Sequence, residues 1–254
     1  ESWMPEVPLV HFGTRPVDLP ENGMVLGYTG EPEEWFSILN NLNAGMILSQ
    51  KTIIEGIRNE MTSVLNGFSD HFGPVTALRI LKKLLPENAI VTADVGSHLH
   101  LTGQLWDTGE KDRLIITNGW SGMGFGIPAA MAAQLNDCDS TVVCITGDGG
   151  FLMMAGEMIT ARRYNLHVIV VVFSDGELNL IRLKKSWQDL TPYGTMLYSG
   201  DLFGAETFFG VRVFRVESEN EMRNALRDSM LLNEPVIINA AIDPVDYERL
   251  IVKR

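Results

Sequence analysis

Six short β-rich segments, separated by segments with helical periodicity, constrain the fold more than any other feature of this sequence. Most of the six are almost continuously apolar, which is typical of parallel strands that helices cover on both faces. The strand candidates are residues 89–92, 114–117, 141–146, 168–173, 211–216 and 236–242. Helical segments lie between most of them, including residues 127–135, 151–165 and 220–232. The pattern predicts an α/β fold with a doubly wound, mostly parallel six-stranded sheet.

Residues 1–65 do not follow this pattern. The first 60 residues hold nine acidic and three basic side chains and one strand candidate, residues 7–10, which a loop rich in Pro and Gly follows. Residues 33–57 have mainly helical character, interrupted by three Asn and a Gly between positions 40 and 45, and the polar segment from Ser63 to Gly73 is expected to be a linker. We therefore expect residues 66–254 to form the main domain.

Two local signals predict where helices begin. Pro74 suits the first turn of a helix over residues 75–85, where apolar side chains recur on one face. Ser218 and Glu221 have the spacing of a capping box, which predicts the start of the last long helix.

The composition excludes two classes of function. The chain has 20 Lys and Arg against 32 Asp and Glu, a formal net charge of −12 and a pI of about 4.8. Binders of nucleic acid and of anionic membranes need clustered cations, so we expect neither as a partner. The longest apolar run, residues 168–173, is far shorter than the about 20 residues of a membrane helix.

The cysteine content favours a cytoplasmic protein. The only two cysteines, Cys138 and Cys144, are too few and too close for a disulfide framework, and no signal peptide opens the sequence. Because the sequence begins abruptly at Glu1, we expect it to be a fragment of a longer protein.

Unusual residues follow four of the predicted strands. Ligands of doubly wound sheets bind beyond the carboxyl ends of the strands, where loops lead into helices. In this chain those places come just after Asp94, Thr117, Thr146 and Phe173. The sequence therefore predicts that these four loops carry the chemistry.

The sharpest motif is the run Thr-Gly-Asp-Gly-Gly-Phe at residues 146–151. Its glycines let a phosphate approach the backbone, and the amides of Gly149 and Gly150 at a helix start can donate hydrogen bonds to it. Asp148 would repel a bare phosphate but fits a site where it holds a divalent cation that also binds the phosphate. A dinucleotide fingerprint is excluded because it needs a glycine where Leu152 stands. A tight turn with Asp148 as helix N-cap is the alternative without a ligand.

A second acid, Asp175, follows Asp148 by 27 positions and comes directly after the next predicted strand. The two carboxylates should therefore meet at neighbouring strand ends, where at about 4 Å they would repel by roughly 4 kcal/mol in a medium of intermediate dielectric. A bound cation removes this conflict, and two carboxylates, a backbone carbonyl, phosphate oxygens and a water would make an octahedral Mg²⁺ shell. Taken without Asp148, Asp175-Gly176 would be a surface turn.

Two further loops place hydrogen-bond donors and glycines at the same edge. Residues 94–100 include His98, which could bind a phosphate, although a single His is more often structural. Residues 118–130 are a glycine-rich entry to a helix of small residues, where a flat ligand can approach the backbone and contact the flexible Met123. Close helix packing without a ligand is the alternative explanation of the small residues.

Together these motifs resemble those of the thiamine-diphosphate-dependent decarboxylases and carboligases. Gly147-Asp148-Gly149, with a metal-binding amide or acid about 27 residues later, is similar to their cofactor motif. Residues 94–98, 123–130, 216–218 and 245–247 extend the resemblance to the acetolactate synthase group, over about residues 70–254. The resemblance implies that residues 66–254 are the C-terminal domain, which binds thiamine diphosphate and Mg²⁺. Residues 4–60 resemble the end of the middle domain, so residues 1–65 would be its tail and a linker.

The resemblance also implies roles for single residues. Mg²⁺ would be ligated by the side chains of Asp148 and Asp175 and by the backbone carbonyl of Glu177. The residues that line the diphosphate would be Gly96, Ser97, His98, Gly149 and Gly150. The loop that closes over it would contain Leu178, Asn179, Leu180 and Ile181. Met123 would support the bent cofactor and, with Ser121, face its aminopyrimidine ring.

The activity that the resemblance implies is decarboxylation of a 2-oxo acid with carboligation, most simply on pyruvate. In this family a glutamate of an N-terminal pyrimidine-binding domain starts the proton relay. That domain would come from residues upstream of Glu1 or from another subunit, and we assign no catalytic residue within this chain. Relatives pair the two domains across subunits, which implies a homodimer or homotetramer.

Departures from the family pattern leave the substrate open. Ser174-Asp175 and Asn118-Gly119 are more similar to the catabolic, flavin-free acetolactate synthases, whereas Ser97 replaces a common Gln and residues 120–122 fit neither subgroup. One alternative is a carboligase or decarboxylase of another 2-oxo acid, such as an aromatic one. In that case Trp120, Leu178 and Leu180 would shape the pocket.

Another alternative is a cofactor-binding or regulatory module without turnover. Two basic residues carry a separate expectation: Lys184 and Lys185 should lie on a solvated helix face, or steer a substrate toward the site.

Overall fold

The computed structural model describes residues 9–15, 25–41, 47–66, 71–106 and 113–251. The chain divides into two compact units, Glu1–Ser63 and Val64–Arg254. Within the described residues, none of the helices combines the length and the apolar character that crossing a lipid bilayer requires.

The first unit contains a small parallel sheet. β1 (Leu9–Gly13) pairs with β2 (Val25–Thr29), and the Phe12 ring lies 6.0 Å from the ring of Tyr28 and 6.1 Å from that of Trp35. Of the strand predicted at residues 7–10, the last two residues lie in β1 and the first two lie outside the described residues. β2 is missing from the predicted strands because Gly27 at its centre weakens the strand pattern.

Two helices follow this sheet. α1 (Pro32–Asn40) ends where the Asn-rich run begins, whereas residues 42–46 of that run lie outside the described residues. α2 (Ile47–Asn66) extends beyond Ser63, so the prediction that the linker begins there is wrong. The buried side chain of Leu65, which belongs to the core of the second unit, explains why the helix continues.

The second unit is built on a seven-stranded sheet with the order β4-β3-β5-β6-β9-β8-β7. All neighbours are parallel except β7, which pairs antiparallel with β8. The strands are β3 (Ile90–Ala93), β4 (Arg113–Ile116), β5 (Val142–Gly147), β6 (Val168–Ser174), β7 (Thr207–Phe208), β8 (Val211–Val216) and β9 (Val236–Ala241). The predicted α/β class and mostly parallel sheet are confirmed. The predicted number of strands is one too low, because two-residue β7 is too short to leave a periodic signal.

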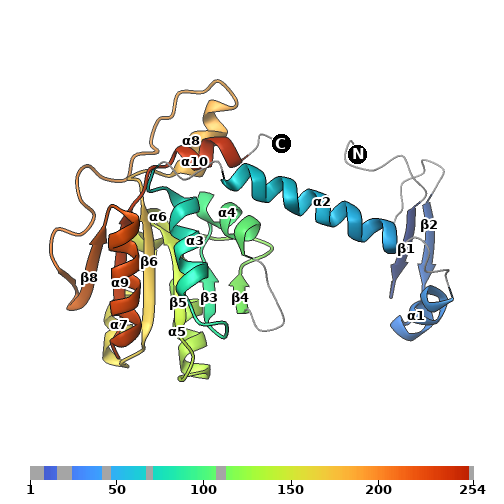
Figure 1. Cartoon of the computed structure of the whole chain (residues 1–254), viewed down its shortest axis with the longest axis horizontal. Coiled ribbons are helices and arrows are strands. Elements are labelled where there is room, and N and C mark those ends of the chain that lie inside the picture. The colour runs from blue at the N-terminus through green and yellow to red at the C-terminus, as the bar shows by residue number, and fades with distance from the viewer. Residues whose placement is uncertain (1–8, 16–24, 42–46, 67–70, 107–112, 252–254) are drawn as a thin grey trace. The chain divides into compact units, whose positions relative to one another are not determined.

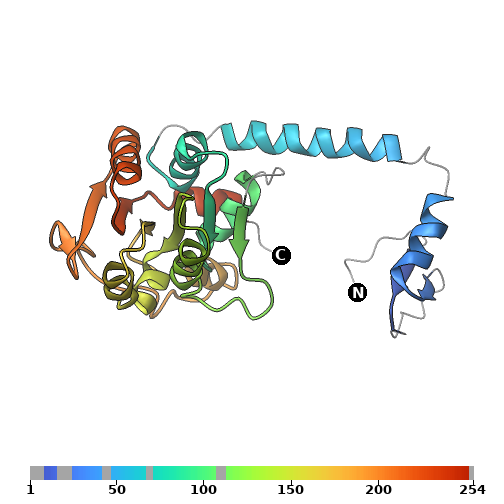
Figure 2. The ribbon, with the colours of Figure 1, turned by 90° about the horizontal axis from the view of Figure 1, so that it is seen from below.

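Helices cover both faces of this sheet (Figures 1 and 2). One face carries α3 (Pro74–Leu84), α4 (Ser97–Leu105) and α9 (Glu219–Leu231), and the other carries α5 (Gly126–Asn136), α6 (Asp148–Met154) and α7 (Glu157–Arg163). Alternate side chains of β5 enter the two cores: Val143 and Ile145 the first, Val142 and Cys144 the second. A strand that is buried on both faces therefore has a continuous apolar sequence.

The strands nearer the sheet edges are less covered than predicted. β3, β5, β6 and β9 are buried along nearly their whole length, but β4 alternates between exposed and half-buried side chains. β8 alternates between buried and exposed side chains in the same way. Since β4 is an edge strand and β8 has only the short β7 beyond it, coverage on both faces is limited to the centre of the sheet.

Two helix predictions differ in detail from the structure. The helix predicted over residues 151–165 is two helices, α6 and α7, with Gly156 at the start of α7. At the start of α9, the Ser218 hydroxyl accepts a hydrogen bond from the Glu221 amide at 3.4 Å, as the capping box predicts. The Glu221 carboxylate accepts its bond from the amide of Glu217, at 2.8 Å, instead of from that of Ser218.

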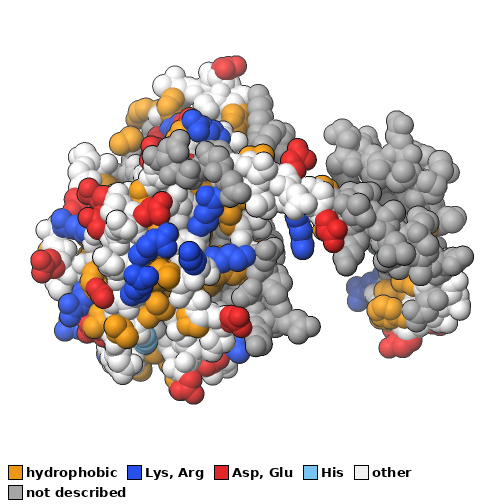
Figure 3. Space-filling model, viewed as in Figure 1, with side chains coloured by type: hydrophobic (Ala, Val, Ile, Leu, Met, Phe, Trp, Pro, Cys, Tyr) orange, Lys and Arg blue, Asp and Glu red, His pale blue; other side chains and the backbone are white. Residues whose placement is uncertain are grey.

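Charged side chains of both signs share the face that Figure 3 shows. Lys and Arg side chains gather over α3 and α9, with Asp and Glu side chains around them. On α9, Arg223 pairs with Glu219 at 3.1 Å, one turn away. The net negative charge of the chain is therefore not concentrated on this face.

The strand order reverses between β3 and β5. The chain runs from β3 to β4 on one side and then returns to place β5 on the other side of β3. In doubly wound sheets, ligands bind at such a point. Asp94 follows β3 and Asp148 follows β5, so two of the four predicted loops lie at this switch point.

Candidate functional site

Asp148 is the first residue of α6 and links the loops after β5 and β6. Its Oδ2 accepts hydrogen bonds from the amides of Gly176 at 2.7 Å and Asp175 at 3.2 Å, so the structure brings the two predicted acid-bearing loops together. Its Oδ1 accepts from the neighbouring Gly149 amide at 2.7 Å. The Gly149 amide, predicted to be free for a phosphate, is therefore engaged within the loop.

A residue that the sequence patterns do not indicate completes this arrangement. The hydroxyl of Tyr198, 50 residues after Asp148, donates to Asp148 Oδ2 at 3.0 Å. Its segment is held beside the loop after β6, because the amide of Leu178 donates to the carbonyl of Thr195 at 2.8 Å and that of Leu197 to the carbonyl of Gly176 at 2.9 Å. Nothing in the local sequence could have placed this tyrosine at the site.

Burial raises the pKa of both acids, and the charge of Asp148 raises that of Asp175 further. Burial, followed by the charge of Asp148, raises the pKa of the Asp175 carboxyl to about 7. Burial also raises the pKa of Asp148, although its hydrogen bonds, that from the Gly176 amide first, oppose the shift. The charged pair is therefore poorly solvated by the protein alone, and a cation would stabilise it.

Glu177 differs from these two acids because its carboxylate is already paired. Oε2 lies 2.9 Å from Nε of Arg182 on α8 (Asn179–Ser186), and Oε1 accepts from the Thr195 hydroxyl at 2.6 Å. The backbone carbonyl of Glu177 accepts one bond, from the Asn179 amide at 2.9 Å, which leaves one lone pair. No group of three or more His, Cys, Asp or Glu side chains with metal-binding geometry occurs in the described part of the chain. The predicted Mg²⁺ set uses only two carboxylates and this carbonyl.

Asp94, at the end of β3, anchors three parts of the site. This fully buried carboxylate accepts from the amide of Gly124 at 3.0 Å and that of Phe125 at 3.2 Å, and from the hydroxyl of Thr146 at 3.1 Å. It therefore ties the glycine-rich loop before α5 and the end of β5 to its own strand. The sequence marks Asp94 only as the residue after a strand, although an acid that follows an apolar strand is itself a signal.

Two further residues of the predicted site, His98 and Asn179, carry buried polar side-chain atoms. Among the described residues, His98 Nε2 and Asn179 Nδ2 are buried without a hydrogen-bond partner. The Asn179 amide lies near Asp175 and lowers the pKa of that carboxyl, which partly opposes the rise, although the two form no hydrogen bond of normal geometry. Asn179 Oδ1 accepts a hydrogen bond from the Ser97 hydroxyl at 3.4 Å. Burial lowers the pKa of His98 to about 4, so its imidazole is neutral at pH 7. Buried polar atoms without a partner are rare, and these two are available to a ligand.

The glycine-rich loop before α5 contributes Ser121 and Met123. Ser121 has a left-handed backbone, with φ of 49°, and its hydroxyl lies 3.5 Å from the Thr117 carbonyl oxygen. The terminal methyl of Met123 lies 2.9 Å from the position that a Cβ on Gly149 would occupy. Met123 therefore covers the start of α6, at the centre of the predicted site.

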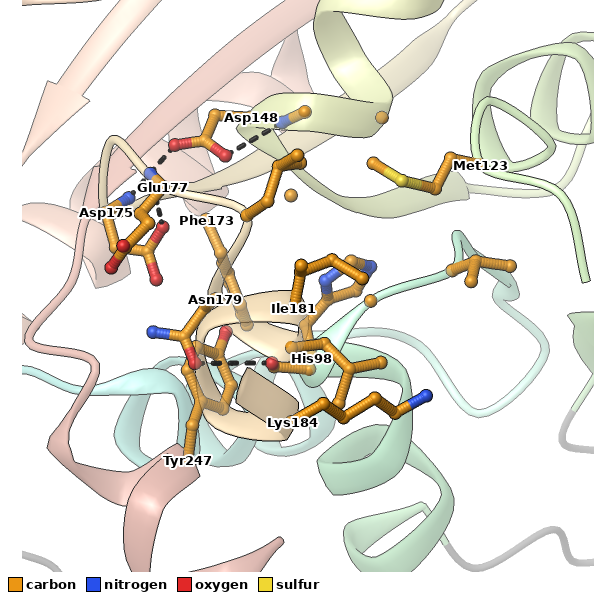
Figure 4. Close-up of a pocket in the computed structure, with 18 of the residues that line it drawn as sticks. His98, Met123, Asp148, Phe173, Asp175, Glu177, Asn179, Ile181, Lys184 and Tyr247 are labelled. Atoms are coloured by element: carbon orange, nitrogen blue, oxygen red, sulfur yellow. Dashed lines mark hydrogen bonds between the residues drawn. The ribbon is translucent and has the colours of Figure 1, made fainter. Parts of the chain in front are cut away.

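All fourteen predicted site residues line one cavity of about 280 Å³ (Figure 4). The carboxylates of Asp148, Asp175 and Glu177 gather at one end of the view, and Met123, His98 and Ile181 lie across from them. Five further residues complete the lining: Val95, Gly147, Phe173, Lys184 and Tyr247. Lys184, expected first on a solvated helix face, is exposed but also borders this cavity.

The cavity fits a ligand that combines a phosphate group and a cation. A Cβ on Gly149 would lie 2.8 Å from Leu178 Cδ2, and one on Gly150 would lie 2.3 Å from Asp94 Oδ2, so both positions need glycine for close approach. Asp148 and Asp175 supply hard oxygen ligands, and His98 Nε2 and Asn179 Nδ2 add polar contacts. These features meet the requirements that the predicted thiamine diphosphate and Mg²⁺ place on a site.

A comparison with protein families matches residues 94–240 to the family described as "Thiamine pyrophosphate enzyme, C-terminal TPP binding domain". The match begins at Asp94 and includes all four strand-end loops. It therefore covers more than half of the chain.

Curated relatives are similar over different shares of the chain. The "Probable acetolactate synthase large subunit" of Methanococcus aeolicus is 33% identical over 185 residues, which are 67% of this chain and 30% of that protein. The protein of the same description from Methanocaldococcus jannaschii is 27% identical over 264 aligned residues, 95% of this chain and 43% of the relative. The "Acetolactate synthase" of Bacillus subtilis is 31% identical over 183 residues, 70% of this chain and 31% of the relative. The chain thus spans less than half the length of each.

A solved structure has the same fold. The "Rhodococcus jostii RHA1 thiamine diphosphate-dependent 4-hydroxybenzoylformate decarboxylase" superposes with a TM-score of 0.61 at 21% identity. The superposition covers 69% of this chain and 33% of that one.

Proposed function

Because this chain belongs to the thiamine pyrophosphate enzyme family through its C-terminal TPP-binding domain, we propose that it holds thiamine diphosphate and Mg²⁺ in an acetolactate-synthase-like enzyme. The proposed reaction is decarboxylation of a 2-oxo acid, pyruvate first, followed by carboligation. Acetolactate synthase large subunits among its relatives support this choice of reaction.

One observation carries the proposal. The buried Asp148 and the half-buried Asp175 lie in the same cavity as the unpartnered Nε2 of His98 and Nδ2 of Asn179. An apolar core would exclude all of these groups, and a surface turn would leave them solvated. A phosphate-bound cation satisfies the carboxylates and the polar atoms together.

In this proposal the acid-bearing loops hold the metal and the diphosphate. Asp148 would hold Mg²⁺ through Oδ1, because its Oδ2 already accepts from three donors, and the Asp175 carboxylate and the Glu177 carbonyl would be the other protein ligands. The diphosphate lies against residues 96–98 and the start of α6 at Gly149 and Gly150.

The apolar wall of the cavity excludes water from the reacting atoms. Leu178, which precedes α8, and Asn179, Leu180 and Ile181 on α8 form one side of the cavity. Met123 and Ser121 form the side on the glycine-rich loop. Exclusion of water strengthens the electrostatic interactions inside. The bound thiazolium ring supplies the electron sink for the loss of CO₂.

The rest of the proposal concerns partners. A cavity of about 280 Å³ is slightly smaller than the about 300–1,000 Å³ of typical ligand pockets, which is consistent with a site that a pyrimidine-binding domain completes. That domain would come from the same polypeptide or from another subunit of a homodimer or homotetramer. We assign residues 1–65 to the tail of a middle domain and a linker. The free thiols of Cys138 and Cys144 fit a reducing cytoplasm.

Calorimetric titration tests the cofactor site. Thiamine diphosphate should bind this chain with Mg²⁺ present, and both EDTA and Asp148→Ala should abolish the heat of binding. Asp228→Ala, which removes an exposed acid on α9, is the matched control and should bind as the parent does. Affinity that survives in Asp148→Ala with EDTA would refute the site.

Product analysis tests the reaction. The protein, combined with its pyrimidine-binding domain, is incubated with pyruvate and separately with an aromatic 2-oxo acid. Acetolactate from pyruvate supports the proposal. Turnover of the aromatic acid alone would show that the substrate is an aromatic 2-oxo acid instead of pyruvate. Cofactor binding without turnover of either acid would show that the protein is a cofactor-binding module without catalytic activity.

A further inference from the structure

The lining of the cavity is unbalanced in charge. Asp148, Asp175 and Glu177 line it, whereas Lys184 contributes the only Lys or Arg side chain among its described lining residues. His98 adds no positive charge at pH 7, because burial holds its pKa at about 4. The whole chain carries a net charge of −12, so its average electrostatic field repels an anionic substrate.

No partner among the described residues keeps Lys184 from such a substrate. The Glu177 carboxylate already pairs with Arg182, and the neighbouring Lys185 donates to the carbonyl of Tyr193 at 2.5 Å. Lys184 has no ion pair or hydrogen bond with any described residue. Within the described part of the chain, therefore, Lys185 is held by a hydrogen bond and Lys184 is not.

The position of Lys184 on α8 aims it at the cavity. It lies three residues after Ile181 and four after Leu180, so the three side chains share one face of the helix, and all of them line the cavity. Figure 4 shows its ammonium group extending away from Asp148 and Asp175, past Ile181. The charge therefore lies apart from the end of the cavity where the metal and the diphosphate are proposed.

We propose that Lys184 binds the carboxylate of the 2-oxo acid substrate and so selects for acids over neutral carbonyl compounds. This inference rests on the proposed function, because it needs an anionic substrate in this cavity. A flexible ammonium group can follow the carboxylate as it enters and can release the neutral CO₂ that forms from it. Lys184 is a specificity-determining residue and takes no part in proton transfer.

Steady-state kinetics of the protein, combined with its pyrimidine-binding domain, tests the assignment. Lys184→Gln should raise KM for pyruvate about tenfold or more, because a charge-assisted hydrogen bond is lost, and should leave kcat within about threefold. Lys184→Arg should restore most of the affinity. Lys185→Gln removes the same charge from the adjacent residue outside the cavity lining and is the matched control, with an unchanged KM.

A binding measurement provides a readout other than turnover. Oxamate, an unreactive anion with the shape of pyruvate, is titrated calorimetrically into parent and variants loaded with thiamine diphosphate and Mg²⁺. Its dissociation constant should rise about tenfold in Lys184→Gln, and the parent's should rise with ionic strength more than the variant's.

The outcomes separate this inference from the proposed function. Equal KM and equal oxamate affinity in parent and Lys184→Gln would overturn the inference while the function stands. A parallel loss of thiamine diphosphate affinity in Lys184→Gln would also overturn it, because the lysine would then serve the diphosphate. If the parent neither binds the cofactor nor turns over any 2-oxo acid, the proposed function itself fails.

Discussion

The carboxylate of Asp94 accepts a hydrogen bond from the backbone amide of Gly124 at 3.0 Å, although 30 residues separate them. This bond joins the end of β3 to the glycine-rich loop that carries Met123. The Thr146 hydroxyl donates to the same carboxylate from the end of β5, so three chain segments around the cavity share one buried acceptor.

Asp94→Asn should weaken the hydrogen bonds that join the segments of the site, while the side chain at position 94 keeps nearly the same size and shape. With its oxygen in the place of Oδ1, Asn still accepts from the Gly124 and Phe125 amides, but its NH₂ group replaces Oδ2. The Thr146 hydroxyl then loses this acceptor and the Gly124 amide faces a second donor, at a cost of about 1–3 kcal/mol. Denaturant unfolding should show this loss, and calorimetry should show weaker thiamine diphosphate binding. Asp228→Asn on the exposed face of α9 is the control. Equal cofactor affinity in Asp94→Asn would contradict this anchoring role.

Gly150→Ala and Gly156→Ala should have opposite effects on the free energy of unfolding. Gly150 lies in the first turn of α6, and Gly156 lies two residues after its end. A Cβ on Gly150 would lie 2.3 Å from Asp94 Oδ2 and 2.9 Å from Thr146 Oγ1, whereas one on Gly156 would meet nothing within 4 Å. Overpacking should cost Gly150→Ala about 1–3 kcal/mol of unfolding free energy. Gly156→Ala, in a helical backbone, should gain up to about 1 kcal/mol. Equal stability of the two variants in thermal unfolding would disprove the predicted close packing at Gly150.

Asp175→Asn should stabilise the metal-free protein in a pH-dependent way. The folded-state pKa of Asp175 is raised to about 7, so its ionisation destabilises the fold progressively as pH rises from about 4 to 7. The gain of the variant over the parent should therefore be small near pH 4 and grow by at most about 1.4 kcal/mol per pH unit up to pH 7.

Comparing variant with parent isolates Asp175 from His98, whose lowered pKa acts in the opposite direction. Neutral His98 contributes stability above its unfolded-state pKa of 6.5, and this stability is lost as pH falls toward 4. Both measurements are made in EDTA by chemical denaturation. Adding Mg²⁺ and thiamine diphosphate should stabilise the parent more than the variant, because the Asn amide oxygen can still ligate the metal but lacks the charge of the carboxylate. A gain that does not vary with pH would refute the prediction.

Tyr198→Phe tests the hydroxyl that reaches Asp148. It removes one of three donors to Asp148 Oδ2, which should cost about 0.5–1.5 kcal/mol in unfolding experiments. Because Oδ1 keeps its free lone pair for Mg²⁺, cofactor affinity should fall far less than in Asp148→Ala. Tyr193→Phe is the control, since Tyr193 is 86% exposed and borders no part of the cavity. Loss of cofactor binding as complete as in Asp148→Ala would mean that Tyr198 itself is essential to the site.

The sequence alone determined the fold class and which loops meet. Buried parallel strands need apolar side chains on both faces, so their positions are visible as continuous runs such as residues 168–173. Parallel topology then brings the carboxyl ends of these strands to one edge. Asp148 and Asp175 could be paired from the sequence for this reason, although 27 residues separate them.

Only the tertiary structure decided which atoms face the cavity. The reach of Tyr198 to Asp148, the pairing of Glu177 with Arg182 and the orientation of Lys184 all depend on how the segments around α8 pack. Such loop contacts join distant positions and leave no periodic pattern. The prediction that β4 is covered on both faces was wrong for the same reason. Burial depends on which residues are neighbours in space, and the sequence gives only the neighbours along the chain.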